Sequence, residues 1–141
     1  MGTSTAGIAH AALVADILNK PMGYVRGSNK SHGRQNRIEG AVREGMKVVV
    51  VEDLISTGGS SLEVVDALRE AGCEVLGLVA IFTYGLKDSI KNFADKDCHF
   101  VTLSNYDALL PVAVEHNYIK EEALEKLKAW KVDPHDESWM T

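Results

Sequence analysis

The residues best suited to chemistry follow the apolar run Val48–Val51. Glu52 and Asp53 come directly after this run, and a turn rich in hydroxyl groups and glycine leads from them into a predicted helix. Backbone N–H groups in such a turn, together with the helix N-terminus, form a cradle for a phosphate. Carboxylates suit the hydroxyl groups of a sugar, or a hard cation held through water. The segment therefore predicts a site for a phosphorylated ribose.

The residues assigned to this site are Glu52, Asp53, Leu54, Ile55, Ser56, Thr57, Gly58, Gly59 and Ser60. Gly58 and Gly59 would let the backbone approach the ligand closely. The segment has no Gly-Lys-Ser/Thr ending of a Walker loop and does not follow the Gly-x-Gly-x-x-Gly dinucleotide pattern. The alternative to a ligand site is a tight strand–helix turn whose acids are only solvated. That alternative does not explain why so many neighbouring positions all suit a phosphorylated ribose.

A second segment of unusual composition is the polar stretch from Arg26 to Gly40, where Arg26, Lys30, His32, Arg34 and Arg37 gather. The 141-residue chain as a whole has a formal net charge of −5. A protein that binds nucleic acid through its general surface should be basic. We therefore expect this basic segment to bind a small polyanionic ligand, and we expect no nucleic-acid partner.

Alternating strands and helices must position these segments. The patterns predict strands at about 22–25, 47–52, 74–82 and 99–104, helices at about 6–19, 61–71, 87–94, 107–116 and 120–130, and loops over 27–39 and 53–60. This alternation is typical of a parallel α/β sheet with right-handed crossovers. Ligands in such sheets bind at the carboxyl ends of the strands, where Gly2–Ala6, Arg26–Gly40 and Asp53–Ser60 would converge.

Gly2-Thr3-Ser4-Thr5 stands directly before the first predicted helix, with no predicted strand to lead into it. We therefore expect either a truncated chain or an unpaired sheet edge.

The apolar runs are far shorter than the roughly 20 residues that span a bilayer, so no membrane segment is expected. Cys73 and Cys98 lie in apolar surroundings; their spacing leaves a disulfide open, and two reduced thiols in a cytoplasmic protein is the simpler interpretation.

These motifs resemble those of the type I phosphoribosyltransferases. Val48–Ser60 resembles the family's phosphoribosyl-pyrophosphate motif, and Gly2–Ile8 its pyrophosphate loop. Tyr24-Val25-Arg26, Lys30-Ser31-His32-Gly33 and Asn36-Arg37-Ile38-Glu39-Gly40 resemble the flexible catalytic loop of orotate phosphoribosyltransferases. The resemblance implies transfer of phosphoribose from phosphoribosyl pyrophosphate to orotate, with Mg²⁺ as cofactor, in pyrimidine biosynthesis. It also implies a homodimer with shared active sites.

The resemblance also implies the roles of individual residues. Lys30, His32 and Asp53 match catalytic positions. Thr3, Ser4, Thr5, Arg26, Lys30 and His32 match residues that contact the pyrophosphate. Glu52 and Asp53 match the acids that face the ribose hydroxyl groups and, directly or through water, the Mg²⁺. Ser56–Ser60 match the 5′-phosphate cradle, and Ser56 also matches a position that touches orotate.

The chain departs from the pattern where Gly27 replaces a second basic residue, and where Tyr84 or a neighbour replaces an orotate-gripping arginine of some relatives. We expect a phosphoribosyltransferase core over 1–132 that lacks the family's N-terminal hood, and a polar tail over 133–141. Alternatives are a purine-type phosphoribosyltransferase, a non-catalytic regulator with this fold, or an inactive fragment.

Overall fold

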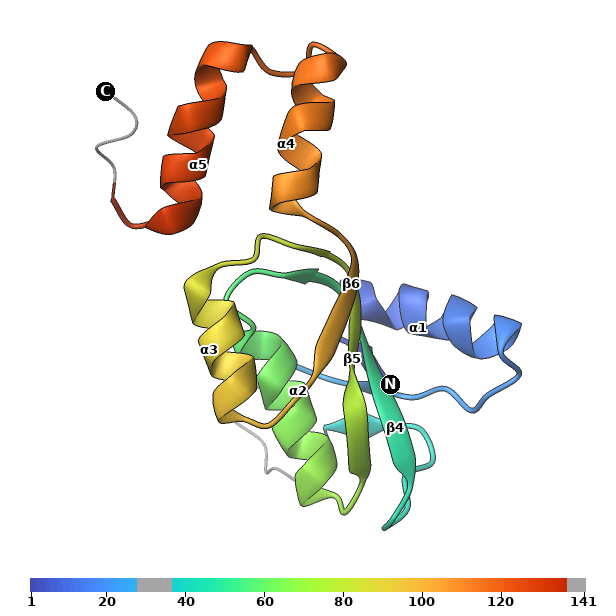
Figure 1. Cartoon of the computed structure of the whole chain (residues 1–141). Coiled ribbons are helices and arrows are strands. Elements are labelled where there is room, and N and C mark those ends of the chain that lie inside the picture. The colour runs from blue at the N-terminus through green and yellow to red at the C-terminus, as the bar shows by residue number, and fades with distance from the viewer. Residues whose placement is uncertain (28–36, 137–141) are drawn as a thin grey trace.

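The computed structural model describes residues 1–27 and 37–136, which build one six-stranded sheet with helices on both of its faces (Figure 1). The strand order is β3-β2-β1-β4-β5-β6. Neighbouring strands are parallel except for β2 and β3, which are antiparallel. The expected parallel α/β sheet flanked by helices is confirmed, except that one pair of strands, β2 and β3, is antiparallel.

The strands are β1 (Gly2–Thr3), β2 (Tyr24–Val25), β3 (Ile38–Glu39), β4 (Lys47–Ile55), β5 (Glu74–Thr83) and β6 (Phe100–Asn105). The helices are α1 (Ala6–Ile17), α2 (Gly59–Glu70), α3 (Lys87–Asp95), α4 (Tyr106–Glu115), the short 3₁₀ helix η2 (Glu121–Ala123) and α5 (Leu124–Val132).

The main core lies between the sheet and the layer of α2 and α3, which share one face (Figure 1). Helix α2 buries Leu62, Val64, Val65 and Leu68, in which steps of three and four residues keep the side chains on one face of an amphipathic helix. Each such side chain contributes about 1.5–3 kcal/mol when fully buried. This packing fixes β4 and α2 relative to each other, and with them the short turn that joins the two.

Helix α1 covers the opposite face, where it packs on β1 and β4 (Figure 1). Gly7 and Ala11 are its buried residues, and their small size lets the helix approach the strands closely. A Cβ atom on Gly7 would lie 2.2 Å from Thr3 Oγ1 and 2.4 Å from the Val51 carbonyl oxygen. The first turn of α1 is therefore seated directly on the end of β1 and the middle of β4.

Two predictions about the strands were wrong. Gly2–Thr3 themselves form a strand, β1, which makes parallel pairs with β2 and with β4, so this strand lies inside the sheet and the expected unpaired edge is not found there. The polar segment before Gly40 also ends in a strand, β3, whose Ile38 pairs with Val25. Two-residue strands are too short to show a periodic pattern, and pairing with long neighbours stabilises them.

The predicted 53–60 loop is also much shorter than expected. Strand β4 continues to Ile55 and helix α2 begins at Gly59, so only Ser56, Thr57 and Gly58 lie between them. The predicted helix at 120–130 is divided into η2 and α5.

Cys73 and Cys98 are both buried free thiols. No helix among residues 1–27 and 37–136 has the length and apolar character needed to cross a membrane.

Candidate anion-binding site at the carboxyl edge of the sheet

Two helices begin at the carboxyl ends of neighbouring strands: α1 after β1, and α2 after β4. Neither has an acidic residue in its first turn, and neither has a side-chain cap. By contrast, α3, α4 and α5 carry Asp88, Asp107 and Glu125 there. A carboxylate at this position would neutralise the positive end of the helix dipole. The two positive ends beside β1 and β4 therefore remain available to anions.

The turn before α2 is supported from below by α3. Gly58 caps α2 in the left-handed conformation, with φ 81°, and a Cβ atom there would lie 2.4 Å from Phe93 Cε2. Asn92 Nδ2 donates a hydrogen bond of 3.0 Å to the Thr57 carbonyl oxygen. Ser56, Thr57, Gly59 and Ser60 are exposed around this support. The predicted phosphate cradle is thus a solvent-exposed turn that packs on α3.

The turn before α1 is held by its neighbouring strands. Ser4 donates from its hydroxyl group to the Val25 carbonyl oxygen at 2.6 Å, and the Ser4–Thr5 peptide bond is cis. Thr3 is buried, whereas Ser4 and Thr5 are exposed. The predicted pyrophosphate loop therefore consists of an anchored residue followed by two residues open to solvent.

The paired acids have different surroundings. Glu52 is only 6% exposed. Its Oε1 accepts from Thr3 Oγ1 at 2.5 Å and from the Asp53 N–H at 3.0 Å, and its Oε2 accepts from Ser61 Oγ at 2.9 Å. Both oxygens thus face protein donors, which differs from the direct contact with ribose hydroxyls that the resemblance implies. Asp53 is half-buried and stands next in the strand.

Burial raises the pKa of Glu52, because a charged carboxylate is less stable away from water, while the hydrogen bonds from Thr3 and Ser61 act in the opposite direction. The raised pKa means that the folded chain holds this proton more tightly than the unfolded chain does. This group's contribution to stability therefore falls as pH rises from the unfolded value towards the raised folded value.

The remaining predicted site residues are distributed as follows. Leu54 is partly exposed, while Ile55 is fully buried and its carbonyl oxygen accepts from Thr83 Oγ1 at 3.2 Å. Arg26 is exposed at the end of β2, where its Nε lies 3.3 Å from Glu39 Oε1. Lys30 and His32 lie outside the described residues, so their predicted catalytic roles stay predictions.

Sequence reasoning missed three supporting residues. Ser61 could have been included, because it continues the hydroxyl-rich segment by one position. Asn92 and Phe93 carry no such signal, since they belong to a helix more than thirty residues away from the turn that they support.

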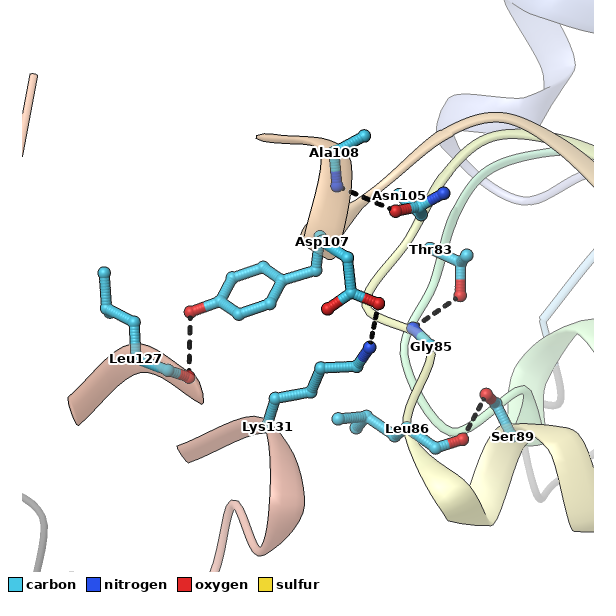
Figure 2. Close-up of polar contacts among 10 residues, drawn as sticks. Thr83, Gly85, Leu86, Ser89, Asn105, Asp107, Ala108, Leu127 and Lys131 are labelled. Carbon is cyan, nitrogen blue, oxygen red and sulfur yellow. Dashed lines mark hydrogen bonds and ion pairs between the residues drawn. The ribbon is translucent and has the colours of Figure 1, made fainter. Parts of the chain in front are cut away.

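The loop after β5 is packed under the C-terminal helices, which stand beyond the carboxyl ends of the strands (Figure 1). The Tyr84 ring lies 5.4 Å from that of Trp130 and 5.9 Å from that of Tyr106. Figure 2 shows the polar contacts around this packing: Lys131 pairs with Asp107 at 2.5 Å, and Tyr106 donates to the Leu127 carbonyl oxygen. Tyr84 thus joins the carboxyl edge to α4 and α5.

Trp130→Ala is expected to reduce the free energy of unfolding by about 2 kcal/mol, because it removes a large, partly buried ring from this aromatic cluster. It should also expose α5 to limited proteolysis. Tyr118→Ala is the control, since Tyr118 is 84% exposed and its loss should change little. Urea unfolding and protease digestion of both variants test this; equal behaviour of the two would show that the cluster does not hold α5.

The fold defines a mostly parallel α/β protein with two helix N-termini open at the carboxyl edge of its sheet. The chain belongs to the phosphoribosyltransferase family: the family model described as "Phosphoribosyl transferase domain" matches residues 1–117.

Individual relatives are consistent with this assignment. The chain is 62% identical over 139 residues to an orotate phosphoribosyltransferase of Bacillus pumilus, covering 99% of this chain and 66% of that protein. It is 56% identical over 138 residues to the orotate phosphoribosyltransferase of Bacillus subtilis, covering 98% of this chain and 64% of the relative. The chain thus spans slightly less than two thirds of these relatives.

Among solved structures, orotate phosphoribosyltransferase from Aeropyrum pernix superposes with a TM-score of 0.71 at 32% identity, over 78% of this chain and 61% of that one. The fold is also shared with adenine phosphoribosyltransferase from Leishmania tarentolae, with a TM-score of 0.61 at 21% identity, over 75% of this chain and 60% of that one.

Proposed function

We propose that the chain is the catalytic part of an orotate phosphoribosyltransferase, which transfers phosphoribose from phosphoribosyl pyrophosphate to orotate and releases pyrophosphate. The observation that carries the proposal is the pair of acid-free helix N-termini on neighbouring strands, with Asp53 at the same edge. The high identity to proteins named orotate phosphoribosyltransferases favours orotate as the acceptor base.

In this mechanism the N-terminus of α2 binds the 5′-phosphate. Backbone N–H groups of Ser56–Ser60 and the exposed hydroxyl groups of the turn supply donors. The α1 turn, with Ser4 and Thr5, faces the pyrophosphate, so charge that develops on the leaving group meets a positive helix end. Asp53 accepts hydrogen bonds from ribose hydroxyl groups and so orients the ring between the two anion sites.

Among residues 1–27 and 37–136 no three His, Cys, Asp or Glu side chains gather to bind a metal ion. Asp53 at the open edge fits an Mg²⁺ ion that takes most of its ligands from substrate oxygens and water. When bound, Mg²⁺ would neutralise charge on the pyrophosphate.

Arg26, Lys30 and His32 complete the proposed pyrophosphate contacts, with Lys30 and His32 as catalytic residues, and Ser56 contacts orotate. Arginine can bind phosphate through two parallel hydrogen bonds, and lysine acts as a point charge. We further propose that the enzyme works in the cytoplasm as a homodimer with shared active sites. Native mass spectrometry tests the dimer directly, and a monomer at micromolar concentration would reject it.

Asp53→Asn is expected to weaken phosphoribosyl pyrophosphate binding by about tenfold to a hundredfold, since hydrogen bonds to a charged acceptor contribute about 1.5–3 kcal/mol. Calorimetric titration with Mg²⁺ present measures this. Asp95→Asn is the matched control, because Asp95 is exposed on the surface of α3, where it pairs with exposed Lys91.

The proposal itself is tested by the unaltered chain. It should bind phosphoribosyl pyrophosphate and, in an assay with adenine, xanthine and orotate, consume only orotate. Absence of donor binding, or consumption of a purine in place of orotate, would reject it.

A further inference from the structure

Glu52 lies between the two turns of the proposed site and is bonded to both. Through Oε1 it accepts from Thr3, the last residue of β1 before the α1 turn. Through Oε2 it accepts from Ser61, which is 1% exposed in the first turn of α2. One carboxylate therefore connects the base of the proposed pyrophosphate loop with the base of the phosphate cradle.

Burying the Glu52 carboxylate costs free energy, and the fold alone does not require a carboxylate at this position. Within residues 1–27 and 37–136, no lysine, arginine or histidine forms an ion pair with Glu52. A buried carboxylate without a cation is unfavourable, and well-packed apolar side chains often stabilise a core as well or better. The carboxylate does have three protein donors, and two of them belong to the two anion turns.

The surrounding packing makes such a connection effective. Thr3 Oγ1 also lies within 3.3 Å of the Val51 carbonyl oxygen, directly beneath Gly7 of α1. On the other side Ser61 belongs to the same helical turn as Gly59, whose neighbour Gly58 rests on Phe93. A change in the length of the Glu52 side chain would be transmitted to both helix N-termini.

We propose that Glu52 is a positioning residue that sets the separation between the two anion turns, so that both charged ends of one phosphoribosyl pyrophosphate molecule bind together. The proposal rests on the proposed function for the identity of this ligand. It assigns Glu52 no contact with the ligand, in contrast to the direct contact that the resemblance implies.

Three substitutions separate the length of the side chain from its charge. Glu52→Gln keeps the length: its amide oxygen can accept from Thr3 and Asp53, and its NH₂ group can donate to Ser61. Glu52→Asp keeps the charge but is one methylene shorter, so it cannot reach both hydroxyl groups in the present geometry. Ser61→Ala keeps Glu52 and removes only its bond to α2.

The test compares the binding of the whole donor, which has two charged ends, with the binding of two smaller ligands that each carry one of those ends. Dissociation constants are measured calorimetrically for phosphoribosyl pyrophosphate, inorganic pyrophosphate and ribose 5-phosphate. We expect Glu52→Asp to weaken binding of the whole donor at least tenfold and of each half less than threefold, because each turn survives but their spacing changes. Ser61→Ala should show the same pattern more weakly, and Glu52→Gln should bind the donor nearly as the original chain does.

Ser89→Ala is the matched control, because Ser89 is a fully buried helix serine whose hydroxyl group donates to the Leu86 carbonyl oxygen (Figure 2). It should lower stability without changing the ratio of donor to half-ligand affinities. Unchanged donor binding in Glu52→Asp and Ser61→Ala, or equal losses for the donor and both halves, would overturn the positioning role.

A second readout needs no ligand. If the original chain bound neither donor nor halves, the proposed function would fail, and amide hydrogen exchange would still decide the role of Glu52. Faster exchange in Glu52→Asp at both 3–8 and 58–62, with Ser89→Ala unchanged there, would support the connection. Unaltered exchange in these two segments would overturn it.

Discussion

Gly58→Ala is expected to lower the free energy of unfolding by about 2–4 kcal/mol and to abolish binding at the phosphate turn. An L-residue in the left-handed conformation costs roughly 1–2 kcal/mol. The new methyl group would also lie 2.4 Å from Phe93 Cε2, and Phe93 is only 2% exposed. Overpacking of this kind costs about 1–3 kcal/mol.

Gly59→Ala provides the matched stability control for this prediction. A Cβ atom at Gly59 would come no closer than 4.0 Å to its nearest neighbour, Thr57 Oγ1, and alanine is the better helix former by about 1 kcal/mol. Urea unfolding of both variants and calorimetric titration of Gly58→Ala with ribose 5-phosphate measure the effects. Equal stability of the two variants would mean that α3 yields to the turn and does not support it.

Gly7→Ala is the second substitution with a large expected effect, and two principles oppose each other there. Helix propensity alone would favour alanine by about 1 kcal/mol. The contacts of 2.2 Å to Thr3 Oγ1 and 2.4 Å to the Val51 carbonyl oxygen oppose it, and neither atom can move without disturbing β1 or β4. We expect the contacts to dominate, with a net loss of about 2 kcal/mol and weaker pyrophosphate binding.

The control for this prediction is Ala9→Gly, at an exposed position of the same helix, which should cost about 1 kcal/mol through propensity alone. Chemical unfolding ranks the variants, and titration with inorganic pyrophosphate tests the turn. A Gly7→Ala chain more stable than the original would show that α1 can shift away from β4 at little cost.

How much of this could be predicted from the sequence depended on the length of each element. The long strands β4 and β5 and the amphipathic helix α2 have strong patterns, and their predicted positions were close to those in the structure. The carboxyl-edge convergence of Gly2–Ala6 with the β4–α2 turn followed from the topology of parallel sheets. The two-residue strands β1 and β3 depend on their pairing with neighbours, so no local pattern predicted them.

The different surroundings of Glu52 and Asp53 could not be predicted for another reason. Alternation along a strand normally indicates which side chains face the core. In Val48–Val51 every residue is apolar, including Val49, which is 40% exposed, so the pattern does not reveal the direction of the acids that follow. Only the positions of Thr3 and Ser61 show that Glu52 turns inward.

The chain order reverses between β1 and β4: the helix after one strand crosses over one face of the sheet, and the helix after the other crosses over the opposite face (Figure 1). An opening at this junction is built by the route of the backbone, before any side chain is chosen. Under the proposed function, the sugar phosphate would therefore be held mainly by backbone groups at this junction, and substitutions elsewhere in the sheet should leave that part of the site in place.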